Sequence, residues 1–183
     1  MGIQKTDAGE IAKRAAELFR NHGYHGTSMA DVANACGLLK GSLYHHFPGK
    51  EDLAIDVLER IRRDFHERIF AIANGHPADS RAALGAMLHT IERYFLDTRG
   101  CLMGAIGLEM SEGVPRIRTL IQGFFDEWVA AFADLLTPVA GRKKALAHAQ
   151  DMVIRIEGAV MWLHIHDDPA PLRRACRPDK ASP

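Results

Sequence analysis

Apolar residues spaced three and four apart dominate this sequence and limit what it can fold into. One stretch carries this pattern over five turns, through Ala54, Leu58, Ile61, Phe65, Ile69 and Ile72. This spacing places apolar side chains on one face of an α-helix, where they can pack against a core. Sustained alternation of apolar and polar residues, the signal of strands, is scarce. An all-α fold is therefore predicted.

Glycine and proline divide the pattern into successive helices. A first helix ends near His22-Gly23, and two short helical segments follow within residues 27–47. Further helices are predicted from 54 to the break at 75–77, over 84–98, 101–110, 115–136 and 142–164. Pro138 is expected to mark a helix boundary. The chain is expected to fray after Asp168.

Composition sets limits on the class of protein. Hydrophobic residues make up 47% of the chain and charged residues 25%, values that are ordinary for a globular protein and exclude general disorder. No apolar run is long enough to cross a bilayer, and the odd number of cysteines, three, argues against a disulfide framework. These features predict a protein of the reducing cytoplasm with no membrane segment. The 23 basic and 23 acidic residues give no overall sign of nucleic-acid binding.

Residues 28–47 have the pattern of a helix-turn-helix. Ser28 and Asp31 form a plausible capping box for the first helix, and Gly37 suits a tight turn. Leu43 and Phe47 are four apart and can anchor the second helix. The polar residues left on its outer side are Lys40, Ser42, Tyr44, His45 and His46. Side chains of these types donate hydrogen bonds to phosphate oxygens.

Residues 7–53 closely resemble the DNA-binding domain of the TetR family of transcriptional regulators. The runs that carry the resemblance are Ala15-Ala16-Glu17-Leu18-Phe19, Gly23-Tyr24-His25-Gly26-Thr27-Ser28-Met29, Val32-Ala33, Cys36-Gly37-Leu38, Lys40-Gly41-Ser42-Leu43-Tyr44-His45-His46-Phe47 and Lys50-Glu51-Asp52-Leu53. The resemblance implies a helix-turn-helix domain over residues 1–53 and a helical ligand-binding and dimerisation domain over 54–183. It also implies a homodimer, joined through its last two long helices, that represses transcription from a palindromic operator in double-stranded DNA and is released by a small-molecule inducer.

The resemblance also assigns roles to individual residues. The expected phosphate contacts are Thr27, Ser28, Tyr44, His46 and Lys50, and the residues nearest the base edges are Lys40, Gly41, Ser42 and His45. Leu39 departs from the family's pattern, which usually has Ser or Thr before the recognition helix. That hydroxyl would cap the helix, so another group is expected to cap it here.

The second part of the chain resembles the family more loosely. Arg99-Gly100-Cys101-Leu102-Met103-Gly104, together with Glu109, is similar to a subgroup whose regulatory domain opens with a Gly-Cys-Leu segment. Methionine and aromatic side chains suit the walls of a site for an apolar or aromatic effector, although such residues also form ordinary cores. The candidates are Phe95, Cys101, Met103, Phe124, Phe125, Trp128, Met161 and Trp162.

Some features of the sequence are also compatible with other functions. Cys101 suits a thiol sensor of oxidants or electrophiles, because it lies at a predicted helix N-terminus near Arg99, but it equally suits a small buried hydrophobe. A helical dimer that binds a ligand without DNA also remains open. His164 and His166 alternate along a helix and do not face one another, so no metal site is predicted. No cofactor is predicted, and the sequence has no phosphate-binding glycine loop or Gly-x-Ser-x-Gly motif, so it does not indicate an enzyme.

Overall fold

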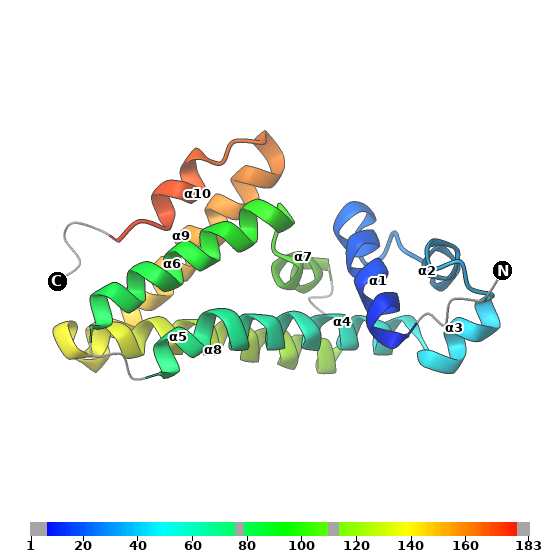
Figure 1. Ribbon diagram of the computed structural model, residues 1–183, viewed down its shortest axis with the longest axis horizontal. Helices are drawn as coiled ribbons and strands as arrows, with labels where there is room; N and C mark the ends of the chain where they lie inside the picture. The colour runs from blue at the N-terminus through cyan, green and yellow to red at the C-terminus, as the bar shows by residue number, and fades with distance from the viewer. Residues whose placement is uncertain (1–6, 76–78, 110–113, 179–183) are drawn as a thin grey trace. The chain divides into compact units, whose positions relative to one another are not determined.

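The regular secondary structure is entirely helical in the part of the chain that the computed structural model describes, which is residues 7–75, 79–109 and 114–178. This confirms the predicted all-α fold (Figure 1). No helix within these ranges is both long enough and apolar enough to cross a membrane. The helices are α1 (Ala8–His22), α2 (Met29–Ala35), α3 (Lys40–His46), α4 (Lys50–Phe65), the π-helix η1 (His66–Phe70), α5 (Ala71–Asn74), α6 (Ser80–Thr98), α7 (Leu102–Glu109), α8 (Pro115–Ala140), α9 (Arg142–His166) and α10 (Ala170–Ala175).

The chain divides into two compact units. The first, here called the head unit, comprises Met1–Ile61 and Leu102–Ile121. It holds α1, α2, α3 and α7, with most of α4 and the start of α8. The second, the body unit, comprises Arg62–Cys101 and Gln122–Pro183. The head unit therefore contains a segment, residues 102–121, that lies far along the sequence from the other helices of that unit.

The core of the head unit forms where α1, α2 and α3 meet. Asp7 caps α1, since its Oδ1 accepts a hydrogen bond of 2.8 Å from the backbone N–H of Glu10. Each helix contributes fully buried side chains, among them Ile11 and Phe19 of α1, Val32 of α2 and Leu43 of α3. Because each of these helices is short, burial of these apolar faces, more than helix propensity, holds them in place.

An aromatic cluster fills the core of the body unit. Phe65 lies at its centre, with ring centroids 4.6–6.1 Å from those of five neighbours. The neighbours come from η1, α6 and α8 and are Phe70, Tyr94, Phe95, Phe124 and Trp128. Most of the pairs meet edge to face, the arrangement that aromatic quadrupoles favour.

The long helix predicted from residue 54 contains a π-helical turn, which shifts its buried face. The predicted spacing continues from Phe65 through Ile69 to Ile72. Phe70 and Ala73 are buried, however, whereas Ile72 is only half-buried. The wider turn of η1 accommodates an extra residue, as π-bulges do, so the buried face continues one position later.

Two predictions about proline-rich segments were wrong. Pro138 lies inside α8, which continues to Ala140. A proline in the last turn removes only one backbone hydrogen bond, so the helix tolerates it there. The chain also does not fray after Asp168, because α10 follows and packs against α9 with Leu172 and Cys176 buried. Pro171 lies in the first turn of α10, where proline costs no hydrogen bond.

Candidate nucleic-acid interface

The predicted helix-turn-helix is present as α2 and α3. The capping box at the start of α2 is complete. The Ser28 hydroxyl accepts from the Asp31 N–H at 3.2 Å, and Asp31 Oδ2 accepts from the Ser28 N–H at 2.8 Å. The hydroxyl and then the N–H of Ser28 lower the pKa of Asp31, so this cap is ionised at neutral pH. Gly37 makes the turn with a φ of 65°, a conformation that favours glycine.

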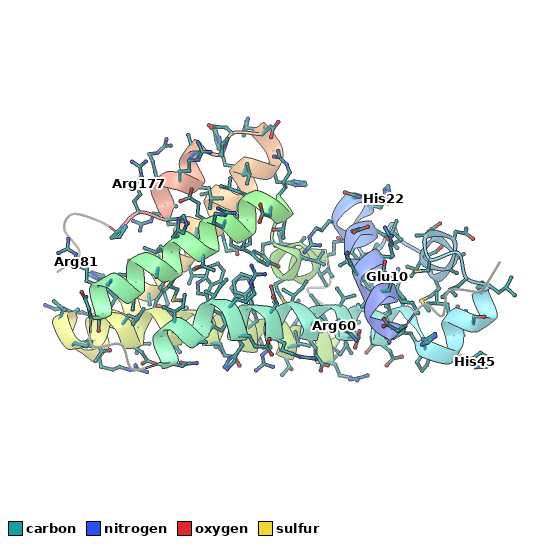
Figure 2. The ribbon with its side chains drawn as sticks, viewed as in Figure 1. Glu10, His22, His45, Arg60, Arg81 and Arg177 are labelled. Atoms are coloured by element: carbon teal, nitrogen blue, oxygen red, sulfur yellow. The ribbon has the colours of Figure 1, made fainter. Side chains whose placement is uncertain are left out.

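Helix α3 presents a polar outer face on an apolar anchor. Leu43 and Phe47 are buried, as predicted, and hold the helix against the rest of the head unit. Figure 2 shows His45 at the outer edge of α3. Among the predicted contact residues of this helix, Ser42 is half-buried. The others are exposed: Lys40, Gly41, Tyr44, His45 and His46.

Two of the predicted phosphate contacts, Thr27 and Lys50, make hydrogen bonds within the head unit. Thr27 is only 1% exposed, and its hydroxyl donates a hydrogen bond of 2.8 Å to the carbonyl of Gly23. The Lys50 ammonium donates to the carbonyls of Tyr24 and Thr27 at 2.9 and 3.0 Å, and it lies 4.3 Å from the centroid of the Tyr24 ring. These hydrogen bonds hold the loop between α1 and α2.

Sequence reasoning assigned no role to the acidic residue that holds the same loop. The carboxylate of Glu109, the last residue of α7, accepts hydrogen bonds from the backbone N–H groups of Tyr24 and His25 at 3.0 and 2.9 Å. The His25 ring nitrogen Nε2 lies 3.2 Å from the Glu109 carbonyl. These residues are 84 and 85 positions apart, so no local pattern could connect them.

Seven of the eight residues predicted to bind an effector fall into three groups, and the eighth, Cys101, is half-buried in the body unit. Phe95, Phe124, Phe125 and Trp128 belong to the aromatic cluster of the body unit. Met103 is buried in the head unit. Met161 and Trp162 of α9 are 60% and 45% exposed, so within a single chain they do not line an interior site.

The body unit also contains two buried polar atoms without a hydrogen-bond partner among the described residues. These are the indole Nε1 of Trp128 and the carboxyl Oε1 of Glu157. An unpaired buried polar group of this kind costs about 1–3 kcal/mol. Burial raises the pKa of Glu157 to about 7, although a hydrogen bond with Cys101 opposes this shift. No motif in the sequence indicates a role for Glu157.

Two of the cysteines have thiols whose pKa is raised. Burial raises the pKa of Cys36 and raises that of Cys176 to about 12, which suits packing roles. Cys101 is half-buried and engaged with the Glu157 carboxyl. Arg99, expected to favour a Cys101 thiolate, pairs with Asp167. Among the described residues no group of three or more His, Cys, Asp or Glu side chains is arranged to hold a metal ion.

Leu39 is the N-cap of α3, and its side chain makes no capping hydrogen bond and is 80% exposed. Substitution by serine supplies a hydroxyl that can accept a hydrogen bond from a backbone N–H of the first turn, and it is expected to stabilise the protein by about 1 kcal/mol. Leu39→Ser should therefore raise the melting temperature and keep or tighten binding to operator DNA, as measured by calorimetry and a DNA titration. Leu39→Ala is the control for loss of the leucine side chain. Weaker binding by Leu39→Ser alone would show that the added hydroxyl interferes with the DNA.

The pKa of Glu157 makes the stability of the protein depend on pH. The folded chain holds this proton up to about pH 7, whereas an unfolded chain releases it near pH 4.5. The contribution of Glu157 to stability is thus largest below pH 4.5, falls as the pH rises to about 7 and is then level, with a total loss of roughly 3 kcal/mol. Glu157→Gln should remove this component in urea denaturation at pH 5, 6, 7 and 8. The exposed Asp126→Asn should follow the wild type, and parallel curves for wild type and Glu157→Gln would contradict the assignment.

Comparison with known families accounts for both parts of the chain. Residues 11–57 match the family described as bacterial regulatory proteins, tetR family. Residues 72–177 match the C-terminal domain of LmrA/YxaF-like transcriptional regulators. The HTH-type transcriptional regulator LmrA of Bacillus subtilis is 27% identical over 177 residues, covering 93% of this chain and 94% of that protein. The HTH-type transcriptional repressor KstR2 of Rhodococcus jostii is 40% identical over 86 residues, covering 44% of this chain and 39% of that protein.

The fold agrees with these matches. A TetR transcriptional regulator from Legionella pneumophila superposes with a TM-score of 0.82 at 20% identity, covering 95% of this chain and 96% of that one. The two family matches together cover most of the described chain, and the helix-turn-helix lies inside the first match. Members of this family are DNA-binding transcriptional regulators and not enzymes. The chain is a member of the TetR family of transcriptional regulators.

Proposed function

We propose that the protein is a dimeric repressor that binds a palindromic operator and leaves it when a small apolar or aromatic effector binds. The observation that carries the DNA-binding part is the outer face of α3, where Lys40, Tyr44, His45 and His46 are exposed on a helix anchored by Leu43. A helix of this kind enters the major groove of DNA. Ser28 is exposed at the start of α2 and is proposed to contact a phosphate. Gly41 and Ser42 lie in the first turn of α3, beside Lys40.

The dimer is proposed to form through α8 and α9. Helix α9 leaves a row of large apolar side chains exposed: Ile154, Met161, Trp162 and Ile165. These positions fall on one side of the helix, and exposed apolar patches of this kind usually mark an interface. A two-fold dimer would place its recognition helices on half-sites about 34 Å apart, or a multiple of that distance.

The effector is proposed to bind in the body unit, beside the aromatic cluster. Phe95, Phe124, Phe125 and Trp128 supply apolar walls, and the unpaired atoms of Trp128 and Glu157 supply one hydrogen-bond donor and one acceptor. Helix α4 has Phe65 of this cluster as its last residue and Lys50, which holds the loop between α1 and α2, as its first. A shift of α4 on effector binding would therefore change the positions of the two recognition helices of the dimer.

The test is a selection of purified protein on random duplex DNA at a fixed and stated salt concentration. An enriched palindrome would establish a sequence-specific dimeric regulator and give the probe for effector screening. If no sequence is enriched, with or without candidate effectors, the protein is a helical ligand-binding dimer without DNA function. Sedimentation of wild type and Ile154→Glu tests the interface, because a buried charge at that position should yield monomers.

The thiol-sensor alternative finds no support in these contacts. A sensor needs an exposed thiolate favoured by positive charge, whereas Cys101 is half-buried and bonded to a carboxyl group.

A further inference from the structure

We propose that Glu109 is a positioning residue for operator binding, which holds the loop Gly23–Thr27 in the conformation that sets α2 and α3. The inference rests on the proposed role of these helices in binding DNA. Glu109 belongs to neither helix and lies about eighty residues further along the chain. Its role is therefore to fix the DNA-binding surface from outside the motif.

The contact is a carboxylate received by two adjacent backbone N–H groups. Glu109 Oε1 accepts from Tyr24 at 3.0 Å, and Oε2 accepts from His25 at 2.9 Å. Hydrogen bonds to an ionised acceptor are about twice as strong as neutral ones. Both N–H groups belong to a turn between helices, and neither has another hydrogen-bond partner among the described residues, so the carboxylate supplies the bonds that this turn lacks.

The close approach of Glu109 also depends on Gly23. The backbone of Gly23 has a φ of 75°, and a Cβ at this position would lie 2.9 Å from Glu109 Oε1. Glycine is thus required here both for the backbone conformation and for the space that the carboxylate occupies.

The loop is held on both sides of its backbone. Glu109 binds its N–H groups, while the Lys50 ammonium binds the carbonyls of Tyr24 and Thr27 and the Thr27 hydroxyl binds that of Gly23. The next residue is Ser28, which caps α2, and α2 packs against α3. A loop freed on its N–H side would therefore loosen the start of α2 and, through it, the placement of α3.

Segment 102–121 reaches a second part of the DNA-binding region. Arg116, in the first turn of α8, lies 3.8 and 3.6 Å from the carboxylates of Glu51 and Asp52 in the first turn of α4. These ion pairs are exposed and weak. They link the same segment to α4, the helix that follows α3. The bonds of Glu109 are therefore the strongest of several contacts between this segment and the DNA-binding region.

Simple electrostatics and a positioning role predict opposite effects on DNA binding when Glu109 is removed. A carboxylate on a DNA-binding unit repels phosphates, so its removal alone should tighten binding. A positioning role predicts weaker binding when the same charge is removed. Glu17 offers a matched control, because it is an exposed glutamate on α1 that pairs with Arg14 at 3.5 Å.

The experiment compares Glu109→Ala, Glu109→Gln and Glu17→Gln by hydrogen exchange and by titration with the duplex enriched in the selection. Exchange of the Tyr24 and His25 amides should accelerate in Glu109→Ala, less so in Glu109→Gln, whose amide oxygen can still accept one bond, and not in Glu17→Gln. Operator affinity should fall about tenfold in Glu109→Ala, recover partly in Glu109→Gln and stay equal or rise in Glu17→Gln.

Slow exchange of both amides in Glu109→Ala, or operator affinity that is unchanged or higher in that variant, would overturn the proposal. The exchange measurement needs no DNA, so it separates this inference from the proposed function. If Glu109→Ala fails to fold, Glu109→Gln keeps the test: unchanged amide exchange and unchanged affinity in that variant would count against the positioning role.

Discussion

Truncation of Phe65 to alanine is expected to lower the free energy of unfolding by about 3–5 kcal/mol. Phe65 is 1% exposed and contacts five other aromatic rings, so its removal leaves a cavity that its rigid neighbours cannot fill. For a domain of marginal stability this is a large part of the total. Urea denaturation followed by circular dichroism measures the change directly.

The control is Phe125→Ala in the same cluster. Phe125 is half-buried and its ring contacts those of Phe124 and Trp128, so the loss should be smaller than for Phe65. Equal losses for the two variants would show that the cluster relaxes around either ring, and that Phe65 is not its centre in energetic terms.

The combined change Tyr44→Ala and His45→Ala is expected to weaken operator binding by at least about thirtyfold, since each of the two contacts to a base or phosphate is worth about 1–3 kcal/mol. Both side chains are exposed on α3, so folding and dimerisation should be unchanged. Fluorescence anisotropy with labelled operator gives the affinity, and thermal unfolding and sedimentation check the protein itself.

His89→Ala provides a matched control, because His89 is exposed on α6 in the body unit and should not affect DNA binding. Tyr44→Phe separates the hydroxyl from the ring. Operator affinity within a few-fold of wild type for the double variant would mean that α3 does not carry the main contacts.

The local features of the fold could be predicted from the sequence because each depends on neighbouring residues. The Ser28–Asp31 capping box, the Gly37 turn and the Leu43 and Phe47 anchor all lie within one or two helical turns of their partners. The end of α6 and the start of α9 likewise follow from apolar periodicity and glycine. The sequence does not predict α10, because its prolines indicate an irregular tail, although a first-turn proline is compatible with a helix.

The tertiary contacts of the site could not be predicted in this way. A resemblance assigns a role to a position, but it does not show that Thr27 is buried or that the Lys50 ammonium is bound to two carbonyls. The bond between Glu109 and the loop joins residues far apart in sequence and depends on how α7 packs against α1. Similarly, Met161 and Trp162 share the composition of a ligand site but lie on the exposed face of α9.

The bond from Glu109 to the loop also bears on how such regulators can be recombined. Residues 102–121 lie within the stretch that matches the C-terminal family, yet they belong to the same compact unit as the helix-turn-helix. A chimera made by joining the first 61 residues of one relative to the remainder of another would therefore replace the loop but not the carboxylate that binds it. Transplantation of operator specificity should succeed more often when residues 102–121 are exchanged together with the first helices, and new specificities would evolve under the constraint of keeping that pair matched.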